Sequence, residues 1–480
     1  MKKYILIILC CLTSFPLWSY NVNMIVEHYS VDQGLPNNTV NCTLKDRDGF
    51  IWFGTWYGLC CFDGVKFKTF NKQEHDSDVP PRKIQRIVED KNGYIWVKTI
   101  DRKLYVFNKV TECFHAVYDD MKNYSENIQV IKLQNTAEGD VLLLTKDKNL
   151  LLAGVDEKGQ VTIKILFDSR DEINKHDYTL KHHVLCETEE YISWIGTDYK
   201  VSAVHKGAEL ASRPADFITS KINSGDKDSF TSFFEDGRKV WVGDRAGIFY
   251  SIDVRTGLVN RYVLSEIKGA ISNLLVTPAG YVYLSVAGQG TYEYDLAERR
   301  LQKINTEMND AMVTHAFIDQ YDKIWFHENE KALIYYDPLN HTAKRFPFTM
   351  FGKITTLYSE DAGERGLFFL SPAGEAWLFD REHVEMVYIN KLKQLSNDRA
   401  NQQFYHLMLD NDGVLWLSSA DEGVYCMNFP KKQFNLLSLS PQSAGRENYA
   451  TGVRAFSNQK VAISGWAPVG RVFIGWTGTV

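Results

Sequence analysis

The sequence lacks long apolar runs, blocks of like charge and a regular cysteine framework. After the first twenty residues, no stretch of about 18 uncharged apolar residues occurs, so no membrane-spanning helix is predicted. The formal net charge is −6 and there is no basic stripe, which argues against a nucleic-acid partner. The cysteines show neither regular spacing nor CxxC pairs, so we predict neither a disulfide scaffold nor a zinc site.

Motifs of catalysis are also missing. There is no G-x-S-x-G elbow, P-loop or H-E-x-x-H, and most histidines are scattered singly. His182 and His183 are adjacent, so on a strand they would point to opposite faces and make a poor metal pair. We therefore predict no enzyme activity, no cofactor and no metal site.

The N-terminus has the pattern of an export signal. Lys2 and Lys3 are followed by the apolar run Tyr4–Leu12, and Ser19 offers a cleavage point after a small residue. A lipid-attachment cysteine is the less favoured alternative, because neither cysteine in this run follows the usual small residue. We assign residues 1–19 to a signal peptide and expect the chain to be periplasmic.

The sequence is rich in aromatic residues and in one repeated pattern. Its 25 Tyr, 27 Phe and 11 Trp suit half-buried strands. The repeat consists of a strand, an acidic turn with Gly, a strand centred on an aromatic residue, and a third strand. Asp46–Thr55 is the clearest copy, and Glu89–Val97 is the second. In all there are nine copies at a mean spacing of about 45 residues, which is typical of four-stranded propeller blades. Three of the nine are degraded, at Gly139–Leu144, Gly280–Leu284 and Gly366–Leu370.

Each part of the repeat has a physical role. Asp accepts local backbone N–H groups in a tight turn, and Gly49 can adopt a positive φ. Gly54, after the aromatic strand, would let neighbouring blades approach closely near the axis. A calcium loop beginning at Asp46 is disfavoured, because its twelfth position is Tyr57 rather than Glu. Cys60 and Cys61 fit a strand that points them to opposite faces.

A wider pattern surrounds the first copy. Tyr29–Val40 (YSVDQGLPNNTV) leads directly into DGFIWFGT and then into Phe62-Asp63-Gly64. This stretch resembles the opening of the two-component regulator propeller family, the periplasmic sensor region of hybrid two-component systems. The resemblance is specific over Tyr29–Phe70 and continues more weakly through Leu436.

The resemblance implies paired seven-bladed propellers that recognise an oligosaccharide, followed by a β-sandwich, a spanning helix, a kinase, a receiver and a DNA-binding domain. None of these later parts is seen before Val480, so we expect a sensor region without its kinase. We predict an all-β chain with a seven-bladed propeller over residues 23–350, closed by Asn23–Val31 against the blade of Trp325. Residues 351–480 would form two to three blades of a partial second propeller. A single ring of nine or ten blades is the alternative, outside the common range of four to eight.

Loop residues after the aromatic strands are the ligand-binding candidates. Trp56, Tyr57 and Tyr199 could stack on sugar rings, and Arg245 could pair with an anionic group. Loop aromatics also pack locally, so these four residues remain candidates only. The expected partners are an oligosaccharide, a second copy of the chain or a membrane-bound signalling protein. Two alternative functions stay open: a secreted propeller scaffold that binds proteins, and a polysaccharide-active propeller enzyme such as a lyase.

Overall fold

The computed structural model consists almost entirely of antiparallel strands. The chain divides into two compact units, Met1–Phe429 and Pro430–Val480. Within the described residues, no helix has the length and apolar character needed to cross a membrane. The structure describes residues 25–70, 81–122, 129–146, 149–167, 180–188, 190–196, 201–207, 217–220, 230–304, 313–328, 331–351, 358–361, 366–371, 375–391, 404–428, 449–455, 461–467 and 470–476.

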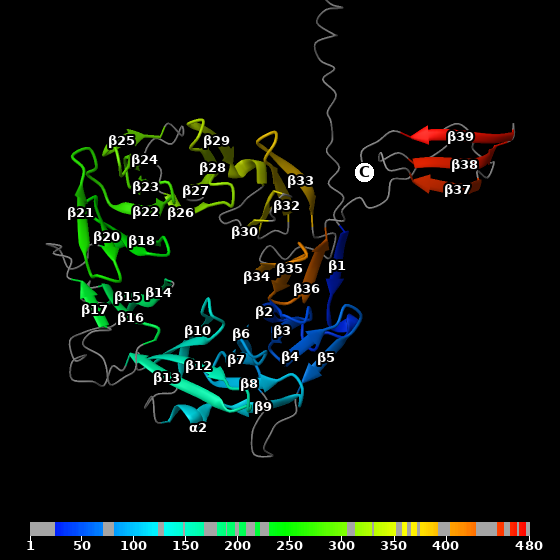
Figure 1. Ribbon diagram of the computed structural model, residues 1–480, viewed down its shortest axis with the longest axis horizontal. Coiled ribbons are helices and arrows are strands. Elements are labelled where there is room, and N and C mark those ends of the chain that lie inside the picture. Colours follow the sequence, from blue (N-terminus) through cyan, green and yellow to red (C-terminus); the bar gives the residue numbers. More distant parts are fainter. Residues whose placement is uncertain are drawn as a thin grey trace, which may run out of the picture. The chain divides into compact units, whose positions relative to one another are not determined.

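Among these residues, the first unit contains nine four-stranded sheets. We call the strand at the inner edge of each sheet its first strand (Figure 1), and we number the sheets 1 to 9 in the chain order of these first strands. Sheet 1 comprises β2 (Val40–Lys45), β3 (Ile51–Thr55), β4 (Gly58–Phe62) and β5 (Phe67–Phe70). Sheet 2 comprises β6 (Ile84–Glu89), β7 (Ile95–Thr99), β8 (Leu104–Asn108) and β9 (Cys113–Ala116). Sheet 3 comprises β10 (Val130–Asn135), β11 (Val141–Thr145), β12 (Leu150–Val155) and β13 (Val161–Phe167).

The next three sheets repeat this order. Sheet 4 comprises β14 (Leu180–Glu187), β15 (Tyr191–Gly196), β16 (Val201–His205) and β17 (Phe217–Ser220). Sheet 5 comprises β18 (Phe230–Glu235), β19 (Lys239–Asp244), β20 (Ile248–Asp253) and β21 (Val259–Val263). Sheet 6 comprises β22 (Ile271–Val276), β23 (Tyr281–Val286), β24 (Gly290–Asp295) and β25 (Arg300–Lys303).

The last three sheets include one strand from the start of the chain. Sheet 7 comprises β26 (Val313–Ile318), β27 (Ile324–Glu328), β28 (Ala332–Asp337) and β29 (Thr342–Pro347). Sheet 8 comprises β30 (Tyr358–Asp361), β31 (Leu367–Leu370), β32 (Glu375–Asp380) and β33 (Glu385–Lys391). Sheet 9 comprises β34 (Phe404–Leu409), β35 (Leu415–Ser419), β36 (Val424–Asn428) and β1 (Ile25–Tyr29). Short helices are η1 (Val31–Gln33), α2 (Tyr118–Met121) and η4 (Phe348–Phe351).

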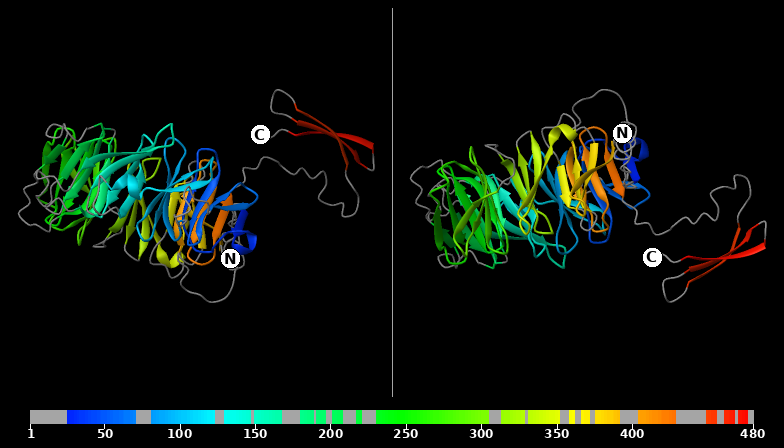
Figure 2. Two further views of the ribbon diagram at one scale, coloured as in Figure 1. Left: turned by 90° about the horizontal axis from the view of Figure 1, so that it is seen from below. Right: turned by 90° about the horizontal axis from the view of Figure 1, so that it is seen from above.

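The nine sheets follow one another around a ring, as expected for a β-propeller (Figure 1). Seen from the edge, the strands of these sheets run between the two faces of the ring (Figure 2). The core is divided into nine apolar clusters, and each lies between two successive sheets. Trp325 of sheet 7, for example, packs with Phe369 and Phe379 of sheet 8. The prediction of an all-β propeller is therefore confirmed.

Buried acidic residues explain the repeated turn and the repeated tryptophan together. In sheet 1, Asp46 Oδ1 accepts the backbone N–H groups of Asp48 and Phe50, while Oδ2 accepts Trp52 Nε1–H at 2.7 Å. The same indole-to-carboxylate bond recurs in sheets 2, 5, 7 and 9. One side chain thus caps the hairpin and satisfies a buried indole donor, which fixes the spacing between the acid and the aromatic residue.

Two sheets without this tryptophan use threonine instead. Thr136 Oγ1 accepts the N–H of Asp140 in sheet 3, and Thr277 Oγ1 accepts that of Tyr281 in sheet 6. Leu142 and Tyr283 occupy the positions that correspond to the tryptophan. A hydroxyl is sufficient there because the turn has no indole to accept. The degraded copies expected near Gly139 and Gly280 are therefore complete hairpins in the structure.

The ring closes through β1, as expected, but in a different sheet from the one predicted. β1 pairs antiparallel with β36, so that Val26 lies opposite Met427 and His28 opposite Tyr425. The prediction that this segment completes the Trp325 sheet is wrong. Trp416 of sheet 9 also packs against Phe53 and Phe62 of sheet 1.

The predicted boundary near residue 350 is wrong for the same reason. Trp325 and Phe346 of sheet 7 share one core cluster with Phe369 of sheet 8, and sheets 8 and 9 share the next. The compact unit continues to Phe429. The arrangement matches the alternative of one larger ring.

The second unit contains one antiparallel sheet among its described residues. Its strands are β37 (Tyr449–Ala455), β38 (Val461–Ala467) and β39 (Gly470–Trp476), with β38 in the middle. Residues 1–19, which we assign to a signal peptide, lie outside the described residues, so that assignment stays a prediction.

Candidate functional site: the inner strands of the ring

The first strand of each sheet lies nearest the middle of the ring (Figure 1). First strands of neighbouring sheets contact one another, for example β2 with β6 and β22 with β26. Eight of the described first strands carry a register shift after their first paired residue. In seven of them, all except that of sheet 4, the next paired residue faces the penultimate residue of the second strand. We call these facing residues the inner pairs: Cys42–Gly54, Arg86–Lys98, Lys132–Leu144, Ser232–Gly243, Asn273–Ser285, His315–His327 and His406–Ser418.

Inner pairs lie where neighbouring sheets approach most closely. A Cβ atom added to Gly54 would lie 2.6 Å from Ile84 of sheet 2, and one added to Gly243 would lie 2.7 Å from Ile271 of sheet 6. These contacts confirm the expectation that glycine at this position permits close approach of the blades. Polar side chains also bridge here: Asn41 donates to the Ile84 carbonyl at 2.6 Å.

Sheet 2 differs from the other six sheets that have an inner pair, because its pair consists of two cations. Arg86 and Lys98 are directly opposite each other across β6 and β7. Lys98 is only 6% exposed, whereas Arg86 is exposed. The Lys98 ammonium donates to Gln85 Oε1 at 2.8 Å and to the Ile131 carbonyl of sheet 3 at 2.6 Å. Like charges directly opposite each other destabilise a sheet, so this pair needs an explanation other than stability.

The electrostatics of the site reflect an excess of positive charge. Burial, followed by the nearby Arg102 and Arg86, lowers the pKa of Lys98 to about 8. Burial and Arg86 also lower the pKa of His406 in sheet 9 to about 4. Within the described part of the chain, His406 Nδ1 is buried without a hydrogen-bond partner, and no carboxylate pairs with Lys98. The charge of Arg86 therefore affects a group of its own sheet and a group of sheet 9.

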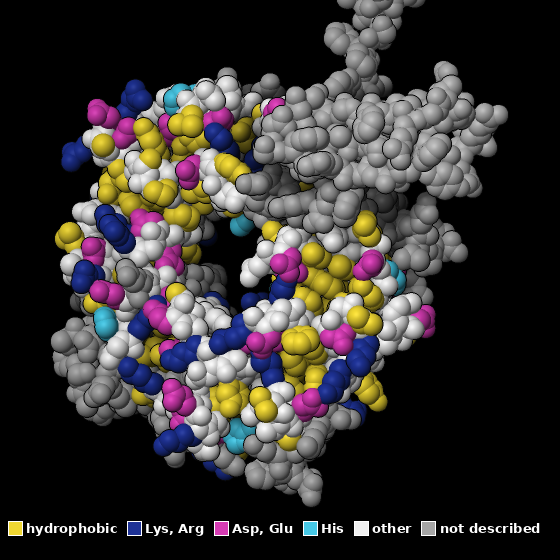
Figure 3. Space-filling view, turned by 45° about the vertical axis from the view of Figure 1, so that its right-hand side comes forward, with side chains coloured by type: hydrophobic (Ala, Val, Ile, Leu, Met, Phe, Trp, Pro, Cys, Tyr) yellow, Lys and Arg dark blue, Asp and Glu magenta, His cyan; other side chains and the backbone are white. Residues whose placement is uncertain are grey.

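The space-filling view shows where basic side chains gather on one face of the ring (Figure 3). The ring has an opening at its middle, and Lys and Arg side chains lie along one edge of it (Figure 3). A guanidinium with a nearby ammonium can hold a carboxylate or sulfate, because such oxyanions accept several charge-assisted hydrogen bonds at once. The inner strands thus offer a binding surface for an anionic group.

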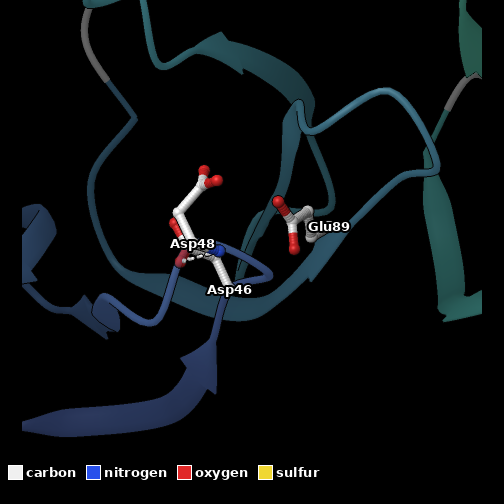
Figure 4. Close-up of side chains that lie close together, drawn as sticks. All are labelled: Asp46, Asp48 and Glu89. Carbon is white, nitrogen blue, oxygen red and sulfur yellow. Dashed lines mark hydrogen bonds between the residues drawn. The ribbon is translucent and has the colours of Figure 1, made fainter.

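A second charged cluster lies on sheets 1 and 2, and it has its own cation. Carboxylate oxygens of Asp46, Asp48 and Glu89 lie within 4.8 Å of one another (Figure 4). The ammonium of Lys109 contacts all three, at 3.1, 2.6 and 2.8 Å respectively. These acids raise the pKa of Lys109. The cluster is an ion-pair network that joins two neighbouring sheets, and the lysine occupies the place a metal ion would take.

The three predicted ligand-binding residues that the structure describes lie on turns and not on the inner strands. Trp56 and Tyr57 form the turn between β3 and β4 and are 45% and 58% exposed. Lys83 lies 5.3 Å from the Trp56 ring centroid, and Arg82 lies 5.1 Å from that of Tyr57. The structure therefore brings these two aromatic residues together beside two cations.

The other two candidates are not brought to this turn. Arg245 is exposed in the turn between β19 and β20, the equivalent turn of sheet 5. Sheets 2, 3 and 4 lie between it and sheet 1 in chain order. Tyr199 lies outside the described residues. A role of Trp56, Tyr57, Tyr199 and Arg245 in ligand binding stays a prediction.

Sequence reasoning missed the cationic pair, although the sequence contains a signal for it. Ile51-Trp52-Phe53 is followed by Gly54, but the matching triplet Ile95–Val97 is followed by Lys98. The same comparison places Gly243 after the triplet of sheet 5. A charged residue at the position of closest blade contact departs from the repeat, and aligning the copies residue by residue would have revealed it.

Comparison with known proteins agrees with the propeller class that the sheets define. Residues 34–57 match the family model described as two component regulator propeller. The matched segment begins directly after η1 and covers β2, β3 and the turn at Trp56, which belong to sheet 1. The predicted resemblance to this propeller family is confirmed by that match. A search of curated proteins found no match.

Solved structures with a similar fold include extracellular sensor domains. The extracellular domain assigned to a one component system of B. thetaiotaomicron is 14% identical, with 90% of this chain and 72% of that chain covered and a TM-score of 0.37. A domain assigned to a hybrid two component system of the same organism is 16% identical, with coverage of 94% and 59% and a TM-score of 0.33. BamB from Moraxella catarrhalis is 11% identical, with coverage of 73% and 95% and a TM-score of 0.42.

Proposed function

We propose that this chain is the ligand-sensing propeller region of a two-component regulator, exported to the periplasm, with an oligosaccharide as its ligand. The observation that carries the proposal is the family match at residues 34–57, which falls on sheet 1 of the ring. In this role the chain binds the ligand and passes the signal to a membrane-bound partner or to a second copy. We expect no catalysis, cofactor or metal in this role.

The turn of sheet 1 supports a carbohydrate ligand. Sugars are bound by aromatic faces that stack on their apolar sides and by polar groups that reach their hydroxyls. Trp56 and Tyr57 present exposed rings, and Arg82 and Lys83 beside them can donate hydrogen bonds. Arg245 offers a further donor on an equivalent turn.

A thermal-shift screen of the full chain with oligosaccharides from many polysaccharides tests the proposal. A ligand selective for the native state raises the melting temperature, and it stabilises by about 2.7 kcal/mol at a hundredfold excess over its dissociation constant. Trp56→Ala and Tyr57→Ala should weaken a confirmed ligand, whereas Lys66→Gln, an exposed turn residue of the same sheet, should not. A panel in which no oligosaccharide shifts the transition would overturn the carbohydrate assignment. The enzyme alternative predicts new reducing or unsaturated ends after incubation with polysaccharides, and we expect none.

A further inference from the structure

We propose that the Arg86–Lys98 pair on the inner strands of sheet 2 binds an oxyanion, a carboxylate or a sulfate ester, carried by the ligand of this propeller. The inference rests on the proposed function for the identity of the carrier, because the geometry itself specifies only the anionic group. It narrows the ligand class from oligosaccharides in general to those that carry negative charge.

The first argument is the position of the pair within the repeat. Six other sheets have an inner pair at the same place, and none of these pairs consists of two Lys or Arg residues. The residues equivalent to Lys98 are small or apolar in most sheets, such as Gly54 in sheet 1 and Leu144 in sheet 3. The fold therefore does not require a cation at this position.

The second argument is the missing counter-charge. The ammonium of Lys98 is satisfied by two neutral oxygens, and the side chain facing it is a guanidinium. Other basic residues near sheet boundaries pair with acids, as Lys91 does with Asp140 at 2.8 Å and Lys109 does with Glu89. A buried cation without an acid costs stability in the free protein, and a bound anion removes that cost.

The third argument is access. Arg86 is exposed and lies on the first strand of its sheet, so its guanidinium is accessible to solvent and is not sealed between two sheets. Lys and Arg side chains are visible along an edge of the opening in the space-filling view (Figure 3). An oxyanion that enters the opening can accept from the Arg86 fork and from the Lys98 ammonium together.

Two substitutions taken from the protein's own repeat test the inference. Arg86→Asn introduces the residue that sheet 6 has at this position, and Lys98→Leu introduces the residue of sheet 3. Each removes one charge while keeping a side chain that an inner pair tolerates. Because Arg86 is exposed, its substitution preserves folding even if that of buried Lys98 does not. Lys66→Gln is the control, since it removes one exposed positive charge from sheet 1.

The probe is inorganic sulfate, titrated against sodium chloride at constant ionic strength, with the melting temperature and calorimetric binding as readouts. Sulfate also stabilises proteins by exclusion from their surface, so the difference between variants is the informative quantity. We expect both substitutions to weaken sulfate binding by about tenfold or more, and the control to leave it unchanged. Without sulfate, Arg86→Asn should melt no earlier than the unsubstituted chain, because the repulsion is gone. A merely structural role predicts the reverse, an earlier transition with unchanged sulfate binding.

The outcomes separate this inference from the proposed function. If sulfate raises the melting temperature of all variants equally, the anion site is refuted. Binding of a neutral oligosaccharide would in that case still support the proposed sensing function. If the pair binds sulfate but no oligosaccharide shifts the transition, the anion site stands and the carbohydrate ligand fails. Trigalacturonate is the second probe, and maltotriose is its neutral counterpart. If the chain binds trigalacturonate but not maltotriose, and Arg86→Asn weakens that binding, the result supports both the anion site and the carbohydrate ligand. Binding of trigalacturonate that is insensitive to Arg86→Asn and Lys98→Leu counts against the site.

Discussion

Asp90 satisfies the turn and the indole of sheet 2 through one buried carboxylate. Its Oδ1 accepts the N–H groups of Asn92 at 2.9 Å and Tyr94 at 3.0 Å, and its Oδ2 accepts Trp96 Nε1–H at 2.8 Å. Oδ2 also accepts the N–H of Val155 in sheet 3 at 3.3 Å, so the same group links two sheets. Asp90→Ala removes all of these acceptors and leaves the surrounding donors in place.

The expected loss of stability follows from which donors water can reach. A hydrogen bond to a charged group contributes about 1.5–3 kcal/mol, and a buried donor without a partner costs about 1–3 kcal/mol. Water can replace the carboxylate at Asn92, which is exposed, but not at Trp96, whose side chain is fully buried. We therefore expect Asp90→Ala to lower the free energy of unfolding by about 3–5 kcal/mol. The matched control is Asp295→Ala, which removes a turn cap that accepts only backbone N–H groups and should cost about 1 kcal/mol.

A double-mutant cycle separates the indole bond from the turn cap. Trp96→Phe removes the indole donor and keeps an aromatic ring, so in that background Asp90→Ala should cost about 1–3 kcal/mol less. Urea unfolding followed by far-ultraviolet circular dichroism is the appropriate assay, because replacing a tryptophan changes the fluorescence signal itself. If the cost of Asp90→Ala is the same in both backgrounds within about 0.5 kcal/mol, the coupling between acid and indole is refuted.

The hairpins could be predicted from the sequence because their determinants are local. The acid, the glycine and the tryptophan of one hairpin lie within seven residues of one another, as at Asp46, Gly49 and Trp52. Their bonds form inside a single turn, so spacing alone indicates the structure. The opposite faces of Cys60 and Cys61 follow equally directly from strand geometry: they pack into different core clusters.

Ring closure could not be predicted in this way because it depends on contacts between residues far apart in the chain. Every interface between sheets uses the same kinds of apolar residue, so the pattern does not say after how many blades β1 returns. Tyr29 packs near Trp416, but the tryptophan of sheet 7 offers a similar aromatic surface in the sequence. The relative positions of the loop residues could not be predicted for the same reason, because only the ring decides that Trp56 and Arg245 lie on turns of different sheets.

Three further predictions concern the cysteines, one histidine and the closure of the ring. Iodoacetamide followed by mass spectrometry should label the half-buried Cys113 before the four described cysteines whose thiol pKa is raised to about 12 by burial, Cys42, Cys60, Cys61 and Cys426. Earlier labelling of any of these four would contradict the raised pKa of its thiol. In the folded chain, burial lowers the pKa of His406 to about 4, whereas in the unfolded chain the pKa is near 6.5. As the pH falls below about 6.5, the unfolded chain therefore takes up the proton first, and the stability present at higher pH is lost progressively as the pH falls toward 4. His406→Asn should reduce the loss of unfolding free energy between neutral and acidic pH by on the order of 1–2 kcal/mol, a value that allows for the partial exposure of the side chain. The measurement is the urea midpoint at both pH values. If the difference between the two midpoints is the same with and without the substitution, the prediction is refuted. Closure is tested by Glu27→Cys, because residue 27 lies directly opposite the native Cys426 in the pairing of β1 with β36. Opposed residues of an antiparallel pair have Cα atoms about 4.5–5.5 Å apart, within the range a disulfide can bridge. Mild oxidation should therefore join residue 27 to Cys426 in peptide maps and raise the melting temperature, whereas Glu27→Ser should do neither. A Glu27→Cys chain that folds and oxidises without forming this link would show that the first strand closes the ring elsewhere.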